Sequence, residues 1–391
     1  MIFLIFKDLC GFSFRTRAIP CPFPYKSLDP STPGGLLRLF VSSGSQPDTL
    51  EANLKKKVFR NRAVIAVVWL LLVFKSILPF SWSWRFRGYT RHLVRSSELI
   101  DRGKRLMAKL SVIPHPNNFG ARIDGVDTSE KLSKKLIKEI REIWLAHQVV
   151  YFADQFLSHD ELIRFSSTIG AFGDDPYVKS LDDYPNIVEV RREPNERVKL
   201  FGGTWHSDWS FQAEPPDATV LHSKIIPPYG GETNFCDGIR AYESLPADMK
   251  REIQGLSAIH SARKPYSREG VEAGGGSDRT MTLLPSDKAW DIQAHPIVRS
   301  HPETGRHSLW VNPLYTIGIE GYNEANSQRL LNNLFNHMID EDLIYRHRWK
   351  PNMLLFWDNR TVLHSASGRY DGHRRVLHRL TIAGSQPQSA S

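Results

Sequence analysis

The sequence predicts an α+β fold for a domain that spans residues 110–384. The prediction rests on apolar residues at helical spacing near the start of the domain, on a short β-rich run directly behind them, and on later apolar runs separated by Pro and Gly turns. Of all residues, 41% are hydrophobic and 24% are charged, which is typical of a globular protein. The 391 residues exceed what one such domain needs, and we assign residues 1–109 to an extension and residues 385–391 to a tail.

The first expected elements are a helix, a strand and a second helix. Apolar residues recur at helical spacing from Leu132 to Trp144, and the run from Val149 to Phe152 is typical of a strand. Ser158 and Glu161 form a capping-box pattern, which predicts that another helix begins there.

Two later helices are expected at residues 242–253 and 324–339. Between them, within the region 263–284, residues 268–278 are polar and rich in Gly and have no periodic apolar face. We expect this segment to form a mobile lid that closes over substrate. A surface insertion without a function is the alternative.

The strongest functional signal is the His-x-Asp pair formed by His206 and Asp208. Residues i and i+2 of a strand face the same side of it. An extended segment therefore directs both side chains to one point, while Ser207 faces away.

His364 offers a third ligand from a distant part of the chain. It follows the apolar run from Met353 to Trp357, which is typical of a strand, and Asp358 and Asn359 are expected to support it. Two imidazoles and one carboxylate form a facial triad, which holds Fe(II) and leaves positions open for a chelating co-substrate and O₂. The pattern predicts an iron oxygenase, and ordinary structural histidines are the alternative.

Two arginines that follow His364 point to anionic ligands. Arg375 and Arg379 have the same parity, so they share one face of the strand expected there. A guanidinium group grips a carboxylate in a fixed bidentate geometry, and two inward-facing guanidinium groups imply two anionic partners. For Arg374 we expect a solvated position.

These motifs resemble the taurine/2,4-dichlorophenoxyacetate dioxygenase (TauD/TfdA) family of Fe(II)- and 2-oxoglutarate-dependent oxygenases, from Ser111 to Gly384. The matching stretches follow the family's order: Trp205-His206-Ser207-Asp208, Pro227-Pro228-Tyr229-Gly230-Gly231-Glu232-Thr233, His301-Pro302-Glu303-Thr304-Gly305-Arg306, and Trp357-Asp358-Asn359-Arg360 through to Arg379. The resemblance implies a double-stranded β-helix, a jelly-roll and cupin-like core, with flanking helices.

The resemblance also implies roles for individual residues. His206, Asp208 and His364 would bind the iron and form the catalytic centre. Arg375 would pair with the distal carboxylate of the co-substrate 2-oxoglutarate, and Thr233 would hydrogen-bond to the same group.

The implied substrate is a small organic anion. Arg379 matches the arginine that holds the sulfonate in the taurine enzyme, and Trp209, beside an iron ligand, suggests an aromatic-lined substrate site. The implied reaction hydroxylates a sulfonate, sulfate ester or carboxylate and releases succinate and CO₂. The stretch from Phe172 to Val178 lacks the His of the taurine enzyme, so taurine itself is not expected. A catalytically silent β-helix binding module tethered to a membrane is the alternative.

Charge separates the extension from the domain. Residues 1–109 hold 19 Lys and Arg against 6 Asp and Glu, which leaves 32 (51 − 19) against 36 (42 − 6) in residues 110–391. The formal net charge of +9 therefore comes from the extension, and the domain itself carries −4. Nucleic acid is consequently not expected as a partner of the domain.

The extension contains an apolar segment near residues 63–84 that could attach the protein to a membrane. A spanning helix needs about 20 apolar residues, and this run is interrupted by Lys75 and Pro79. An interfacial segment, an internal signal-like stretch, or a true start of the protein close to Met107 are alternatives. The Pro-rich residues 20–50 are expected to be largely unstructured.

Cysteine usage favours a reducing intracellular compartment, either cytoplasmic or membrane-associated. Cys10 and Cys21 lie in the extension and Cys236 stands alone in the domain, so no disulfide framework is implied. We expect Cys236 to be a small core residue. By analogy with the family, we also expect a homo-oligomer.

Overall fold

The computed structural model describes residues 109–390. The apolar segment at residues 63–84 and the two cysteines of the extension lie outside this range, so the expectations made for them remain predictions. Within residues 109–390 no helix combines the length and the apolar character that crossing a membrane requires. The expected boundary between domain and extension also remains a prediction.

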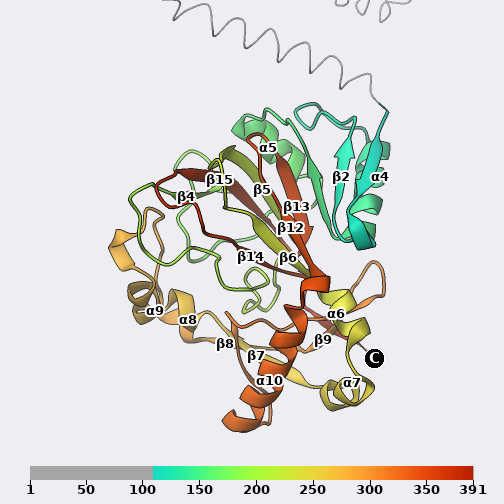
Figure 1. Cartoon of the computed structure of the whole chain (residues 1–391), viewed down its shortest axis with the longest axis vertical. Helices are drawn as coiled ribbons and strands as arrows, with labels where there is room; N and C mark the ends of the chain where they lie inside the picture. Colours follow the sequence, from blue (N-terminus) through green and yellow to red (C-terminus); the bar gives the residue numbers. More distant parts are fainter. Residues whose placement is uncertain (1–108, 391) are drawn as a thin grey trace, which may run out of the picture. The chain divides into compact units, whose positions relative to one another are not determined.

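The largest element is a seven-stranded sheet with the order β1-β2-β3-β13-β5-β15-β4 (Figure 1). Its strands are β1 (Ser111–Pro114), β2 (Ala121–Asp124), β3 (Val149–Phe152), β4 (Val188–Arg192), β5 (Ala218–Ile225), β13 (Leu354–Asp358) and β15 (Arg375–Ile382). All neighbours are antiparallel except β2 and β3. The strands expected at residues 149–152 and 353–357 are confirmed, and both belong to this sheet.

A smaller sheet packs against the large one and completes a two-sheet jelly roll. It has the order β12-β6-β14, formed by β12 (Ile344–His347), β6 (Thr233–Asp237) and β14 (Val362–Ala366). Phe235 on β6 and Val362 on β14 share one buried cluster with Leu377 on β15, so the inner faces of the two sheets meet in a common core. The expected α+β, cupin-like fold is confirmed.

Successive side chains of β13 alternate between two hydrophobic cores, one on each face of the large sheet. Leu354 and Phe356 belong to the outer core, and Leu355 and Trp357 belong to the core between the sheets. Successive residues of a strand face opposite sides, so a strand that is buried on both faces is apolar throughout. All five residues of β13 are buried.

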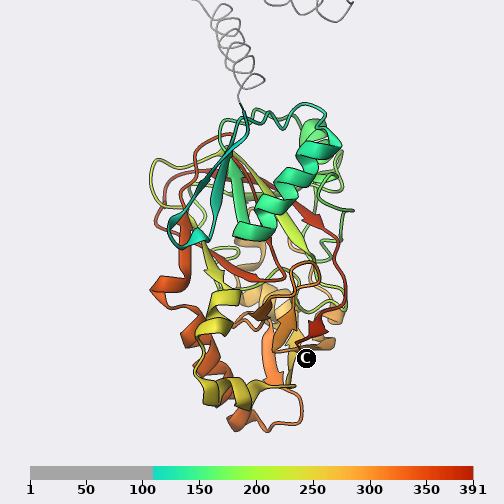
Figure 2. The same ribbon diagram turned by 90° about the vertical axis from the view of Figure 1, so that its right-hand side faces the viewer.

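Two helices cover the outer face of the large sheet, as Figures 1 and 2 show. They are α4 (Lys134–His147), which packs through Trp144, and α5 (His159–Ser166). The capping box expected from Ser158 and Glu161 is present at the start of α5. Both expected helices are confirmed.

A second buried cluster gathers under the sheets around the remaining helices. It involves α6 (Gly238–Ser244), α7 (Ala247–Ile253) and α10 (Glu324–Met338), together with β7 (Ser257–Ser261), β9 (Val298–Ser300), β10 (His307–Leu309) and β11 (Thr316–Ile319). Two further strands, β8 (Ile292–Pro296) and β16 (Gln388–Ser389), pair with β7 and β9. These strands form two three-stranded sheets, β11-β7-β8 and β10-β9-β16. The helix expected at residues 324–339 is confirmed.

The single helix expected at residues 242–253 is wrong. Two helices meet there at Leu245 and Pro246, where Leu245 is extended with ψ 139°. A proline disfavours the helical conformation of the residue before it, and it cannot donate a backbone hydrogen bond. The helical spacing continues across the break because both helices bury apolar residues in the same cluster.

Residues 263–284 contain two short helices, α8 (Arg263–Tyr266) and α9 (Arg268–Ala273). Short 3₁₀ turns are η2 (Gly276–Asp278) in this segment, and η1 (Pro116–Asn118), η3 (Asp287–Trp290) and η4 (Glu341–Leu343) elsewhere. The Ser267 side chain caps α9 by accepting a hydrogen bond from the Gly270 backbone N–H. The segment thus has regular structure that its polar composition did not indicate, while its mobility as a lid remains a prediction.

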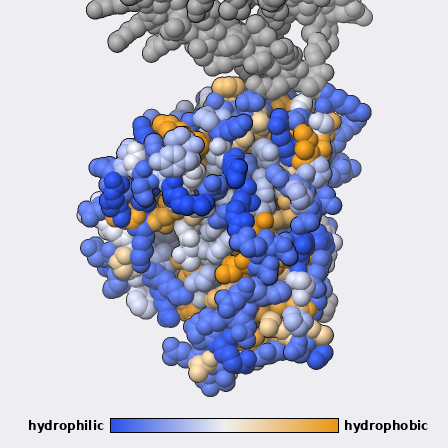
Figure 3. All heavy atoms as spheres, in the orientation of Figure 1, coloured by the Kyte–Doolittle hydropathy of each residue, from blue (hydrophilic) through white to orange (hydrophobic). Residues whose placement is uncertain are grey.

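The face drawn in Figure 3 is mainly hydrophilic, and its hydrophobic residues form small separated groups. Among the described residues the exposed large hydrophobic side chains are few: Ile113, Phe156, Ile225, Tyr229, Leu284, Trp290, Ile292 and Ile339. Cys236 is buried and free, as expected.

Candidate metal centre

The backbones of His206 and His364 are hydrogen-bonded to each other in an isolated antiparallel bridge. The N–H group of each residue donates to the carbonyl of the other, with N···O distances of 3.0 and 2.8 Å. His364 lies on β14, separated by a turn from the strand expected at residues 353–357. The bridge therefore brings two residues that are far apart in the sequence to one place.

The segment expected to be extended through His206 and Asp208 is not a regular strand. His206 makes only the isolated bridge, and Asp208 already belongs to a turn that continues through Trp209, where φ is 44°. The side chains of His206 and Asp208 nevertheless point toward one another, as expected. Ser207 faces away and donates its hydroxyl hydrogen to the Asn359 carbonyl at 2.7 Å.

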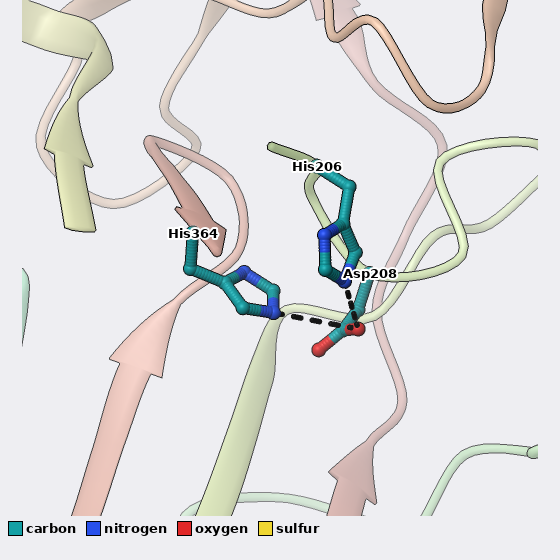
Figure 4. A group of neighbouring side chains, drawn as sticks. All are labelled: His206, Asp208 and His364. Atoms are coloured by element: carbon teal, nitrogen blue, oxygen red, sulfur yellow. Dashed lines mark ion pairs between the residues drawn. The ribbon is translucent and has the colours of Figure 1, made fainter. Parts of the chain in front are cut away.

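Figure 4 shows the three side chains directed toward one another. Nε2 of His206 lies 3.6 Å from Oδ1 of Asp208, and Nε2 of His364 lies 3.7 Å from the same oxygen. Metal–ligand bonds of this kind are about 2 Å long, so one ion can touch two atoms at these separations. All three residues are buried, and one ligand atom from each lies within 4.8 Å of the others.

The protonation states of the three side chains suit a metal ion. Nδ1 of His206 lies 2.7 Å from the Thr204 carbonyl and donates to it, which leaves the Nε2 lone pair for a metal. Burial lowers the pKa of both histidines. Burial alone would raise the pKa of Asp208, but Arg379 and the two histidines outweigh it and lower this pKa to about 2. Neutral imidazoles and an ionised carboxylate are the forms that ligate metals.

Asp208 is held by a second set of contacts. Its Oδ2 atom accepts a hydrogen bond of 2.6 Å from the Thr219 hydroxyl, whose oxygen accepts one of 2.9 Å from the Asn359 amide. The Asn359 oxygen in turn accepts from the Trp357 indole at 2.8 Å. Asn359, which was expected to support His364, is thus linked through Thr219 to Asp208, and the chain of contacts fixes the orientation of the carboxylate.

Asp358 supports a separate buried network beside the centre. Arg360 binds its two carboxylate oxygens in a bidentate contact, with both distances 2.7 Å, and His301 contacts it at 2.9 Å. Arg360 also contacts Glu303 at 2.8 Å. These contacts anchor the turn between β13 and β14, which carries Asn359.

Arg379 is buried and paired with two carboxylates. Its Nη2 atom lies 3.3 Å from Oδ1 of Asp208 and 3.3 Å from Oδ1 of Asp175. The guanidinium group lies over the ring of Trp209, with 4.7 Å to the ring centroid. The Trp209 indole donates to the same Asp175 oxygen at 2.9 Å. Trp209 and Arg379 therefore share this carboxylate. The expected contact of Trp209 with substrate remains a prediction.

Arg375 lies on the same face of β15 and is buried as well. Its guanidinium group lies 6.0 Å from the ring centroid of Tyr370, and its Nε atom has no hydrogen-bond partner among the described residues. A side chain at Gly231 would come within 3.2 Å of Arg375, so the glycine allows this close approach. A buried guanidinium with an unsatisfied donor fits an anionic ligand. Arg374 is exposed, as expected, and it pairs with Glu193.

Thr233 begins β6 and is buried. Its hydroxyl oxygen accepts a hydrogen bond of 2.9 Å from the Trp349 indole. A hydroxyl group has one donor hydrogen besides its acceptor sites. Thr233 can therefore still donate to a ligand while it keeps the bond to Trp349.

A cavity of about 280 Å³ opens onto His206, Asp208 and Arg379. Its wall includes Tyr266 at the end of α8 and Tyr315, whose ring lies 5.9 Å from that of His206. Arg375 instead lines a small neighbouring cavity of about 10 Å³. Leu200 and Phe201 line both cavities and so form part of each wall.

The two tyrosines of the wall were missed by sequence reasoning. Both are buried, and their ring centroids lie 6.4 Å apart. Tyr266 stacks on Tyr177 with a centroid separation of 4.8 Å. Tyr266 lies two residues before the segment 268–278 that is expected to cover substrate, and nothing in its spacing distinguishes it from a core residue.

Three cations of the cavity wall were also missed. Lys199, Lys264 and Arg279 line the cavity with Arg379, whereas Asp208 is its only acidic lining residue among those that the structure describes. The cavity is therefore suited to an anionic ligand.

Comparisons with known proteins agree with this geometry. A family model described as "Taurine catabolism dioxygenase TauD, TfdA family" matches residues 111–381. A 2,4-dichlorophenoxyacetate dioxygenase that depends on alpha-ketoglutarate, from Cupriavidus pinatubonensis, is 32% identical over 291 residues, which are 70% of this chain and 98% of the relative. An alkylsulfatase from Acinetobacter baylyi is 30% identical and aligns with 68% of this chain and 82% of its own.

Solved structures show the same fold. A taurine dioxygenase from Burkholderia xenovorans superposes with a TM-score of 0.60 at 29% identity. The match covers 72% of this chain and 93% of that chain. The similarity therefore extends over nearly the whole of the solved protein. The family match over residues 111–381 includes the residues of the centre described above.

Proposed function

The chain belongs to the taurine catabolism dioxygenase TauD, TfdA family, and we propose that its centre oxidises a small organic anion. It is an Fe(II)- and 2-oxoglutarate-dependent dioxygenase, an oxidoreductase that also uses O₂. When bound, the iron and the co-substrate supply the oxidation: one atom of O₂ enters the substrate, the other enters succinate, and CO₂ is released. The observation that carries the proposal is the convergence of three buried ligands beside a cavity lined by cations.

We assign the iron to His206, Asp208 and His364. The mutual backbone bridge of the two histidines fixes their positions before any metal binds. Thr219 donates a hydrogen bond to Oδ2 of Asp208, so the carboxylate offers Oδ1 to the metal. Ligands fixed in this way require little rearrangement when the ion enters.

We assign the distal carboxylate of 2-oxoglutarate to Arg375 and Thr233. The buried guanidinium of Arg375 lacks a carboxylate partner among the described residues, which makes an anionic ligand favourable there. The Thr233 hydroxyl has a donor hydrogen left after it accepts from Trp349. Both side chains would orient the co-substrate before any chemistry takes place.

The substrate class follows from charge and from the relatives. Four cations line the cavity against one carboxylate, and that carboxylate is an assigned metal ligand. The similar proteins are named for a phenoxyacetate and for alkyl sulfates. We therefore propose a carboxylate, sulfonate or sulfate ester as substrate, with Arg379 as an anion-binding residue at the metal end of the cavity.

The first test is an anaerobic titration of the full chain with Fe(II) and 2-oxoglutarate, monitored through the visible metal-to-ligand charge-transfer band. We expect a band in the wild-type protein, its loss in His206→Ala, and weaker binding of 2-oxoglutarate in Arg375→Ala. Arg374→Ala is the matched control, because it removes a neighbouring arginine that pairs with Glu193 at the surface. A folded, iron-loaded wild-type protein without the band would overturn the assignment.

A further inference from the structure

The Trp349 indole contacts one of the two residues assigned to 2-oxoglutarate. Its Nε1 atom donates to the Thr233 hydroxyl at 2.9 Å, and both side chains are buried. An indole N–H is a donor only, so the Thr233 oxygen is the acceptor in this bond. The hydroxyl hydrogen itself makes no hydrogen bond within the described residues. Trp349 therefore sets the role of the hydroxyl group, which accepts from the indole and keeps its hydrogen for another partner.

Packing holds the indole in this position. Trp349 follows β12 by two residues, and its ring meets the ring of His347 edge-on with a centroid separation of 4.5 Å. His347 lies directly opposite Thr233 in the pairing of β12 with β6. The Nδ1 atom of His347 is 2.8 Å from the Tyr345 hydroxyl oxygen, and both residues are buried. The indole is thus fixed by the same pair of strands that carries Thr233, and a close-packed core leaves it little freedom to turn away.

The Thr233 hydroxyl belongs to the same part of the core as Arg375. Gly231 precedes Thr233 by two residues, and a Cβ atom on this glycine would lie 3.1 Å from Nε of Arg375. Trp349 shares a buried cluster with Leu377, which follows Arg375 by two residues on β15. Nε of Arg375 has no hydrogen-bond partner in the range that the structure describes. Arg375 and Thr233 therefore each bring an unused donor to this region.

Two donors suit a carboxylate better than any neutral group. An ionised carboxylate only accepts hydrogen bonds, whereas a methyl group makes none and an amide also has N–H groups that need acceptors. A threonine hydroxyl without a fixed partner can rotate and either donate or accept. The bond from the Trp349 indole favours the orientation in which the hydrogen points away from Trp349. The same bond polarises the hydroxyl group, which strengthens it as a donor.

We propose that Trp349 is a positioning residue that makes Thr233 a donor and thereby selects a 2-oxo acid with a distal carboxylate as co-substrate. Trp349 acts through Thr233 and not by contact with the co-substrate. The inference rests on the proposed function, because it uses the assignment of Arg375 and Thr233 to the distal carboxylate of 2-oxoglutarate. It adds a residue that determines selectivity from behind the binding site.

The test compares two co-substrates in the anaerobic charge-transfer titration of the full chain with Fe(II). 2-Oxoglutarate carries the distal carboxylate, whereas 2-oxopentanoate has the same chelating end and carries a methyl group in its place. Trp349→Phe keeps a bulky aromatic ring and removes the indole donor. We expect the Kd of 2-oxoglutarate to rise about 3- to 10-fold, because a hydrogen bond to a charged group is weakened. The Kd of 2-oxopentanoate should not change.

A double-mutant cycle shows whether Trp349 acts through Thr233. Thr233→Val removes the hydroxyl group and should weaken the binding of 2-oxoglutarate about 10-fold or more. In the Thr233→Val background, Trp349→Phe should have no further effect, because the two changes remove the same interaction. Thr233→Ser keeps the hydroxyl group and should retain the effect of Trp349→Phe. Trp349→His keeps a ring N–H donor and should restore part of the affinity.

Trp144→Phe is the matched control for the loss of a buried indole. Trp144 belongs to the outer core, and its indole N–H has no partner in the described part of the chain. This variant should leave both Kd values unchanged. An equal rise for the two co-substrates in Trp349→Phe, or an effect that persists in the Thr233→Val background, would show a merely structural role and overturn the inference. An unchanged Kd of 2-oxoglutarate would overturn it as well.

A failure of the proposed function gives a different result. A folded, iron-loaded wild-type protein without the charge-transfer band would overturn the proposed function, and the inference with it. A wild-type band that Arg375→Ala weakens and Trp349→Phe leaves unchanged would keep the proposed function and overturn the inference alone.

Discussion

Nη2 of Arg379 lies 3.3 Å from Oδ1 of Asp208, the same carboxylate oxygen that faces Nε2 of both His206 and His364. A buried carboxylate without a countercharge is costly. In the metal-free protein Arg379 is the nearest permanent cation to this oxygen among the described residues. Arg379 therefore stabilises the empty centre electrostatically, in addition to any contact with substrate.

Replacement of Arg379 by Met should destabilise the metal-free protein more than the metal-bound one. Removing one partner of a buried ion pair costs about 3–5 kcal/mol, and a divalent cation bound to Asp208 should offset part of that loss. Urea unfolding with and without Co(II) measures both values. Arg374→Met is the control at the surface, and an equal loss in the two conditions would contradict the explanation.

The hydroxyl group of Thr219 should contribute to metal affinity. Thr219→Val keeps the shape of the side chain but removes the 2.6 Å hydrogen bond to Asp208. Losses of such supporting contacts typically weaken metal binding by about 10- to 100-fold, and competition with a chelator would measure the change. Thr361→Val is the matched control, because the Thr361 hydroxyl is buried and has no partner in the described part of the chain.

The stability of the domain should fall at mildly acidic pH, in part through His222. Burial, with a contribution from the nearby Lys224, lowers the pKa of His222 to about 4. The unfolded chain then binds a proton below about pH 6.5 that the folded chain does not bind until about pH 4. The free energy of unfolding should therefore decrease as pH falls through this window, by about 3 kcal/mol for this residue.

Chemical denaturation between pH 4 and pH 8 tests this expectation. His222→Gln keeps a donor for the Gln155 carbonyl, which His222 contacts at 2.8 Å, but it does not titrate. The variant should show a shallower dependence of the unfolding free energy on pH. An unchanged slope would assign the acid sensitivity to other buried histidines, such as His378 and His347, whose pKa values are also lowered by burial.

The buried network of Asp358 should be essential for folding stability. Asp358→Ala leaves the buried Arg360 without its bidentate partner, and we expect a loss of about 3–5 kcal/mol in the free energy of unfolding. Asp124→Ala breaks the Arg122–Asp124 pair, whose side chains are 40% and 33% exposed, and should cost less than about 1 kcal/mol. Thermal and urea unfolding of the two variants give the comparison. Similar losses would argue against the network's role.

The metal ligands and the main strands were predictable from the sequence because their signals are local. His206 and Asp208 are two positions apart, and the apolar run at 353–357 reflects a strand buried on both faces. His364 became recognisable through the motif around it. The break at Pro246 was missed because helical spacing continued through it, although the proline itself was visible.

The environment of Arg379 could not be predicted, because it depends on contacts between distant residues. Asp175 lies in an irregular segment far from Arg379 in the sequence, and only the folded sheet brings the two together. Tyr266, Tyr315 and Arg279 likewise meet only in the folded cavity. No periodicity marks such residues, since each belongs to a loop or to the end of a short helix.

The cavity wall is formed by residues of the jelly roll and by residues of a segment outside it. The metal end belongs to the jelly roll, where His206 and His364 share backbone hydrogen bonds and any change disturbs the sheets. Much of the remaining wall comes from one excursion, residues 263–284, which leaves the core after β7 and rejoins it before β8. Much of the cavity wall is thus encoded by a stretch of sequence separate from the metal-binding residues. Exchanging this single excursion between relatives is a route by which the enzyme could acquire new substrates while its oxidative centre stays intact.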